Sequence, residues 1–192
     1  AWRYYFRARL ALLFRQRARA VANYRLALRF DPAFARAAHA LAFLLVRDGH
    51  PAEAQQLLRD VVRRQPGNSQ AWFNLGFVHD QMQQPREAIA AFNEAVRRKP
   101  ALDRAWYGMG LCHRRLGEHH DAARAFEEAA RLQPMNPHAW YELGMTYHTL
   151  ARADEVRRVT EHLNRFDRKM TRQLIHDTGR GDLAHLVADL RV

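Results

Sequence analysis

The chain of 192 residues carries a formal net charge of +11 and has a sequence pI near 10.9. Such a basic chain favours acidic partners, whether an acidic protein, a nucleic acid or an anionic membrane surface. Its single cysteine excludes an internal disulfide. The sequence contains neither an alternating β-branched run bounded by turns nor an uncharged apolar stretch of the roughly 18–20 residues that would span a bilayer.

Residues 1–20, AWRYYFRARLALLFRQRARA, combine arginines with aromatic side chains in a predicted helix. An apolar stripe can form along one side, while the arginines spread around the helix; the stripe consists of Tyr4, Leu10, Leu13 and Phe14. This helix is either a polar-sided end of the fold or a docking element for an anionic surface, namely a membrane headgroup layer or an acidic protein. The predicted docking residues are Trp2, Arg3, Tyr5, Phe6, Arg7 and Arg9.

The positive charge is concentrated in the same part of the chain. Residues 1–34 hold eight arginines against one acidic residue, Asp31, whereas none of the later 34-residue stretches exceeds +2. The chain begins with alanine rather than methionine, so residues upstream of Ala1, a membrane anchor among them, are left open.

Tryptophan and glycine recur along the chain at a fixed spacing. Trp72, Trp106 and Trp140 are 34 residues apart, and the same spacing separates Gly76, Gly110 and Gly144. A period of this length indicates an array of structural repeats. The predicted units are residues 1–34, 35–68, 69–102, 103–136 and 137–170, and prolines occupy the thirty-second place of four of them, at Pro32, Pro66, Pro100 and Pro134.

The pattern resembles the tetratricopeptide repeat, whose signature is W-x2-L-G-x2-Y, then A-x3-F, then P, over 34 residues. The resemblance covers residues 1–170 and is best over residues 69–136. His79 and His113 stand where the family has tyrosine, and the first unit has Tyr4 for the tryptophan and Arg7 for the leucine. The resemblance implies an all-α, right-handed superhelical solenoid of five helix-turn-helix units.

The residues also explain the repeat by packing. Trp140, Leu143, Gly144 and Tyr147 lie on one face of a 3.6-residue helix. Glycine costs a helix interior about 1 kcal/mol against alanine, so we expect it where a neighbouring helix must approach closely. The proline of each unit ends the second helix, because it has no N–H group and clashes with the preceding turn.

Residues 171–192 break the frame and are predicted to cap the solenoid, which residues 1–170 form. Leu174 and Ile175 continue an apolar face, and Thr178–Gly181 is predicted to turn. A last helix, capped by Asp182, would carry Leu183, Leu186, Val187 and Leu190. Solenoids need a terminal element that covers their last core face.

The face of each first helix opposite the tryptophan is the predicted binding surface. Its ninth place reads Arg9, Phe43, Phe77, Leu111 and Met145, and four apolar residues in succession exceed what scattered surface hydrophobes suggest. The alternative, that tight packing between units makes this stripe part of the core, stays open. In the family, first helices line a concave groove that binds partners. The predicted partner-binding residues are Arg36, Phe43, Arg47, Phe73, Asn74, Phe77, Arg104, Tyr107, Leu111, Arg114, Arg115, Tyr141 and Met145.

Nothing in the sequence indicates catalysis or a cofactor. The eleven histidines lack metal-ligand spacing, and no Gly-rich phosphate loop or nucleophile elbow is present. His79 and His113 take equivalent core-facing places, so packing explains them, and Cys112 is predicted to be a small buried hydrophobe. No metal, no cofactor and no catalytic residue is predicted.

The sequence favours a non-catalytic interaction scaffold or assembly chaperone whose concave groove binds a peptide or helix of an acidic, partly apolar partner. The alternative is a module that binds nucleic acid or an anionic membrane surface by charge. Nucleic acid is the less favoured of these partners, because no base-reading module is recognisable and most of the chain is nearly balanced in charge. A cytoplasmic location is favoured, and membrane anchoring is open if upstream sequence exists.

Overall fold

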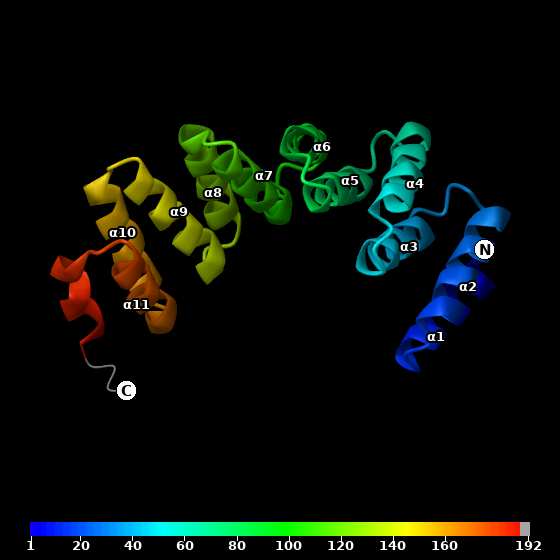
Figure 1. Ribbon diagram of the computed structural model, residues 1–192, viewed down its shortest axis with the longest axis horizontal. Helices are drawn as coiled ribbons and strands as arrows, with labels where there is room; N and C mark the ends of the chain where they lie inside the picture. Colours follow the sequence, from blue (N-terminus) through cyan, green and yellow to red (C-terminus); the bar gives the residue numbers. More distant parts are fainter. Residues whose placement is uncertain (189–192) are drawn as a thin grey trace. The chain divides into compact units, whose positions relative to one another are not determined.

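The computed structural model describes residues 1–188, which contain eleven α-helices, one 3-10 helix and no strand (Figure 1). The predicted all-α class is confirmed. The helices are α1 (Trp2–Leu13), α2 (Arg17–Phe30), α3 (Ala35–Arg47), α4 (Pro51–Arg64), α5 (Ser69–Gln81), α6 (Pro85–Arg98), α7 (Asp103–Arg115), α8 (His119–Leu132), α9 (Pro137–Thr149), α10 (Ala153–Asn164), α11 (Arg168–Asp177) and η1 (Gly181–Val187).

The chain forms two compact units. The first comprises residues 1–100 and holds α1 to α6, and the second begins at Ala101 and holds α7 to α11 and η1. Within each unit successive helices pair, so that α1 packs on α2, α3 on α4, α5 on α6, α7 on α8 and α9 on α10. The first helices of two neighbouring pairs, α3 and α5, also contact each other. This is the helix-turn-helix stacking that the 34-residue period predicts.

Each pair turns at the same place of its repeat. The fifteenth residue of every unit has a left-handed backbone, with φ of +82° at Gly49 and +74° at Gly117. Three units place a side chain there instead, at Arg15 (57°), Gln83 (58°) and Ala151 (56°). Since side chains disfavour this conformation by about 1–2 kcal/mol, the packing of the two helices must enforce the turn where glycine is missing.

The helix glycines face the second helix of their pair or the tail. A Cβ atom on Gly76 would lie 2.6 Å from the Phe92 ring on α6, and one on Gly110 would lie 2.6 Å from the Phe126 ring on α8. At Gly144 the neighbours are Leu174 of α11 at 2.8 Å and Val159 of α10 at 3.2 Å. The prediction that glycine accommodates a neighbouring helix is therefore confirmed.

The repeated tryptophans are half-buried and join the first helix of a pair to the turn before it. The indole N–H of Trp72 donates a hydrogen bond to the Pro66 carbonyl (2.9 Å), and that of Trp140 donates to the Pro134 carbonyl (2.8 Å). Both prolines follow the end of a second helix, as the pattern predicts.

The tail packs on α9 and α10. The Asp167 side chain caps α11 by accepting a hydrogen bond from the Met170 amide (2.8 Å), and Leu174 is fully buried. The helix predicted after Asp182 forms as the short 3-10 helix η1, whose Leu183 and Val187 are buried against α11; the predicted Leu190 lies outside the described residues. Within residues 1–188, none of the helices has the length and apolar character that crossing a bilayer requires.

Candidate partner-binding site

The predicted partner-binding residues divide between exposed and half-buried positions. The exposed ones are Arg36, Phe43, Arg47, Phe77, Arg104, Arg114 and Arg115. The half-buried ones are Phe73, Asn74, Tyr107, Leu111, Tyr141 and Met145. Among the ninth-place residues alone the division follows the two units: those of α3 and α5 are exposed, whereas those of α7 and α9 are half-buried.

In the first unit the ninth-place side chains form a usable apolar surface. Phe43 is 54% exposed and Phe77 is 36% exposed, on first helices that contact each other. The Arg47 guanidinium lies 5.6 Å from the centre of the Phe43 ring. On α5 the predicted Asn74 accepts a hydrogen bond from Gln70 at 2.9 Å, and the Phe73 ring lies 5.8 Å from that of Phe92. Phe43 and Phe77 are therefore the two apolar groups that a partner can reach on these helices.

Phe43 and Arg47 line a pocket of about 760 Å³ in the first unit. Arg15, in the turn between α1 and α2, and Arg17, the first residue of α2, also line it, so that three arginines contribute to the lining. The apolar part of the lining consists of Leu12, Ala40, Phe43 and Leu44. No acidic side chain lines the pocket, and none of the three arginines has an ion-pair partner among residues 1–188.

Arg15 and Arg17 line this candidate site, although the sequence pattern does not single them out. The repeat pattern orders side chains along the first helices and gives no orientation for those in the turn between the two helices of a pair. The left-handed backbone at Arg15 turns the chain back there. The one sequence signal for this site was the excess of arginine in residues 1–34.

In the second unit the predicted residues contact the protein's own core and tail. Leu111, Met145 and Tyr107 pack against a core cluster that includes Phe126 and Leu174. The Tyr141 hydroxyl donates a hydrogen bond to the Asp177 carboxylate on α11 at 2.6 Å. This surface therefore offers a partner fewer free groups than the first unit does.

Arg114, a predicted binding residue, forms an ion pair with Glu142 on the next first helix. Burial raises the pKa of Glu142, although the charge and hydrogen bond of Arg114 act in the opposite direction. Arg114 is thus partly neutralised within the second unit, whereas Arg47 in the first unit is not.

The predicted docking residues of α1 lie mostly in solvent. Trp2, Phe6 and the arginines are exposed, and Tyr5 is half-buried against Tyr24 and Phe34, with ring centres 5.8 and 5.2 Å apart; the exposed arginines are Arg3, Arg7 and Arg9. The Trp2 ring contacts Phe34 at 4.7 Å, and the Arg36 guanidinium lies 5.4 Å from its centre. Arg36 is therefore joined to the N-terminal helix.

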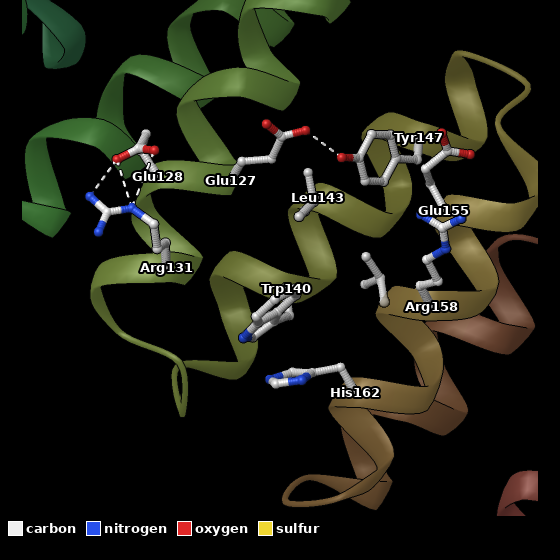
Figure 2. A pocket seen from close by; sticks show the side chains of 10 residues that line it. Glu127, Glu128, Arg131, Trp140, Leu143, Tyr147, Glu155, Arg158 and His162 are labelled. Atoms are coloured by element: carbon white, nitrogen blue, oxygen red, sulfur yellow. Dashed lines mark hydrogen bonds and ion pairs between the residues drawn. The ribbon is translucent and has the colours of Figure 1, made fainter.

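A second pocket, of about 600 Å³, lies between α8, α9 and α10 of the second unit (Figure 2). Its floor is apolar, but its polar groups bond one another: the Tyr147 hydroxyl donates to Glu127, and Arg131 pairs with Glu128 at 2.7 Å. The Trp140 and His162 rings pack 4.1 Å apart across its lower end. Its charged groups are mostly occupied, in contrast to the three arginines of the first unit.

His113 lies beside two carboxylates that sequence reasoning did not connect with it. The His113, Glu118 and Asp121 ligand atoms all lie within 4.8 Å of one another. His113 Nδ1 lies 2.7 Å from Glu118, and Asp121 pairs with Arg124. The equivalent His79 makes the same contact, 2.7 Å from Gln84, so both histidines fasten the turn between paired helices.

Cys112 is fully buried in α7, as predicted for a packing residue. Burial raises the pKa of its thiol to about 11, which keeps it protonated at neutral pH.

The family comparison agrees with the repeat geometry. Models described as tetratricopeptide repeat match residues 11–75, 45–112 and 103–136, which together exceed half of the chain. The chain belongs to the tetratricopeptide-repeat family. A comparison with curated proteins finds no match.

Solved tetratricopeptide-repeat structures share the fold. MamA from Desulfovibrio magneticus RS-1 is 19% identical with a TM-score of 0.71, over 91% of this chain and 94% of MamA. YrrB is 22% identical with a TM-score of 0.72, over 92% of this chain and 90% of YrrB. TTC0263 from Thermus thermophilus is 18% identical with a TM-score of 0.65, over 94% and 98% of the two chains. Family membership supports a role as a protein–protein interaction scaffold, and proteins of this family are generally non-catalytic.

Proposed function

We propose that this tetratricopeptide-repeat protein is a non-catalytic scaffold or assembly chaperone that captures a peptide or helix of an acidic, partly apolar partner. The observation that carries the proposal is the pocket between α3 and the α1–α2 connection, which three arginines and four apolar residues line without any acidic residue. YrrB, a similar fold, is described as a tetratricopeptide-repeat protein with an unusual peptide-binding site, which is in keeping with a peptide as ligand.

The chemistry of the pocket defines its ligand. Carboxylates of the partner would pair with Arg15, Arg17 and Arg47, since guanidinium groups bind carboxylates through two parallel hydrogen bonds. An apolar side chain of the partner would cover the exposed face of Phe43. Aromatic and arginine side chains together are typical of the residues that dominate binding energy. Phe77 on α5 extends the apolar surface beyond the pocket.

A titration with defined peptides tests this function. Peptides that alternate aspartate or glutamate with phenylalanine or leucine should bind the wild-type protein in calorimetry, and Phe43→Asp and Arg47→Glu should each weaken binding by about tenfold or more. Arg59→Glu is the matched control, because it makes the same charge change at an exposed position of α4, away from the pocket. Equal affinities for the wild type and both pocket variants would place the site elsewhere.

The alternative partner, a nucleic acid, is distinguished by composition and by salt. The affinity for a nucleic acid should fall steeply as the salt concentration rises, with a slope set by the number of phosphates that the arginines neutralise. Nucleic-acid binding should not depend on the Phe43 ring. An acidic peptide with an apolar anchor should lose affinity in Phe43→Asp even at high salt, because burial of the anchor is not screened.

A further inference from the structure

Helix α1 carries a second apolar face that the described chain leaves largely exposed; only Trp2, at its start, contacts the rest of the fold, through Phe34 and Arg36. Its packed side holds Ala8 and Ala11, which are buried against the fold. On the other side, large apolar side chains are between 49% and 76% exposed; these are Trp2, Phe6, Leu10, Leu13 and Phe14. They make up five of the nine exposed large apolar residues in residues 1–188.

The exposed apolar residues form one continuous stripe. At about 100° per residue, they fall within an arc of roughly 120°, whose centre lies roughly opposite that of the packed face. Trp2 and Phe6 stack at 5.7 Å within it. A helix that is apolar on opposite sides is normally covered on both. The arrangement therefore differs from the single stripe predicted from the sequence, in which Tyr4 belonged with Leu10; Tyr4 instead stacks on Phe30, at 5.2 Å.

The charges beside this stripe have only one sign. Arg7 flanks it on one side and Arg9 on the other, Arg3 lies within the arc at the start of the helix, and all three are exposed. No acidic residue occurs before Asp31. The exposed polar groups of α1 are thus guanidinium groups, which donate hydrogen bonds and cannot accept them.

From this surface we infer that α1 is a docking helix for an anionic lipid bilayer. A layer of lipid phosphates offers acceptors and negative charge throughout, which matches a face built of donors and apolar groups alone. The surface of a protein partner would expose hydrogen-bond donors as well as acceptors. A second copy of this chain would bring the same arginines to the contact, since the hollows on either side of the stripe are lined by Arg9 and by Arg7 with Arg19.

The docked helix lies in the plane of the bilayer surface. Phe6, Leu10 and Leu13 enter the boundary between headgroups and acyl chains, and the arginines extend sideways to the phosphates along their aliphatic stems. Trp2 anchors the start of the helix at the headgroup level. This role does not depend on the peptide pocket, because the pocket is formed by Leu12, α3 and the α1–α2 turn rather than by the stripe.

Vesicle sedimentation tests the inference with the complete chain. The protein should co-sediment with phosphatidylcholine vesicles that contain phosphatidylglycerol, should bind pure phosphatidylcholine about tenfold less, and should be released as salt rises. Vesicles with brominated acyl chains should quench part of the tryptophan emission, and Trp2→Phe should remove that quenched part while leaving the other three tryptophans unaffected.

Two kinds of variant separate the apolar from the charged contribution. Phe6→Gln with Leu13→Gln removes apolar contacts without changing charge and should lower vesicle binding by about tenfold or more, and Arg3→Glu with Arg7→Glu should do the same through charge. All four positions are exposed, so the helical circular dichroism and melting temperature should be unchanged. Met135→Gln is the matched control, since Met135 is 69% exposed in the turn between α8 and α9 of the second unit, and the substitution should leave vesicle binding intact.

Several results would overturn the inference. One is equal binding to neutral and anionic vesicles, and another is full binding by Phe6→Gln with Leu13→Gln. A third is concentration-dependent dimerisation that this variant abolishes, without vesicle binding, because a second copy would then cover the stripe. The fourth is tight binding of an acidic protein or a nucleic acid through the same residues when vesicles do not bind. None of these outcomes decides the peptide-binding proposal, which is tested by Phe43→Asp.

Discussion

At Gly76 and Gly110 the chain gives up helix propensity to let a phenylalanine ring touch the backbone. The Phe92 and Phe126 rings are almost completely buried, and each occupies the space where a Cβ atom would stand. The sequence predicted this use of glycine because the residue recurs with the same spacing as the large side chains. It did not predict which side chain is the neighbour, since periodicity orders residues along one helix and says nothing of the depth to which another helix approaches.

Gly76→Ala should destabilise the protein despite the better helix propensity of alanine. The new methyl group would lie 2.6 Å from an aromatic ring that has no room to move, and such overpacking costs about 1–3 kcal/mol, against about 1 kcal/mol regained from propensity. Urea unfolding should show the loss. Gly67→Ala is the control, because nothing lies within 4 Å of its Cβ position and its φ is ordinary, so its stability should stay level or rise. A Gly76→Ala variant as stable as wild type would contradict the close contact.

The arrangement of helices explains why the predicted binding stripe is exposed in the first unit and half-buried in the second. All four apolar residues occupy the ninth place of a first helix, so periodicity treats them alike. In the second unit α11 packs on α9, and this helix lies outside the 34-residue frame. Contacts made by a non-repeating element cannot be read from the period of the repeat. Phe43 and Phe77 are exposed as the pattern predicts, while Tyr141 and Met145 are half-buried.

The hydrogen bond between Tyr141 on α9 and Asp177 on α11 should make the protein less stable at alkaline pH. Burial, followed by the hydrogen bond to Asp177, raises the pKa of Tyr141 to about 12, so the folded protein holds this proton more tightly than the unfolded chain, whose tyrosine pKa is about 10. The contribution is complete below about pH 10 and is lost as the pH rises towards about 12.

Tyr141→Phe should therefore be slightly less stable than wild type at pH 7, by about 1 kcal/mol or less, and the difference should vanish between about pH 10 and pH 12. Thermal melts followed by circular dichroism across this range measure it. Asp177→Asn keeps the shape of the acceptor and should shift the alkaline loss to lower pH, because the carboxylate charge contributes to the raised pKa. A constant difference between wild type and Tyr141→Phe over the whole range would show that the hydroxyl does not titrate with folding.

At the scale of the whole molecule, the packing of the helices follows the 34-residue period, whereas the distribution of charge does not. The 34-residue period predicted the helix pairs throughout, because each pair is stabilised by its own repeated residues. The charge is not periodic: residues 1–34 carry most of the excess arginine, and both proposed surfaces lie in the first unit. The sequence predicts an acidic partner from this charge but does not reveal the pocket, since Arg15 and Arg47 come together only through the packing of α3 on the first pair.

Cohesion in a repeat protein is local, because each pair touches only its neighbours. Phe126→Ala in α8 should cost about 3–5 kcal/mol, since a fully buried ring is removed from its contacts with Gly110 and Tyr107. Hydrogen exchange should then accelerate in α7, α8 and α9, with α1 to α4 exchanging as in wild type. Phe92→Ala in α6 is the counterpart: it should accelerate exchange in α4, α5 and α6 and leave α9 to α11 unchanged. If both variants instead raise exchange evenly over residues 1–188, the protein unfolds as one cooperative block, and its two units do not hold their stability separately.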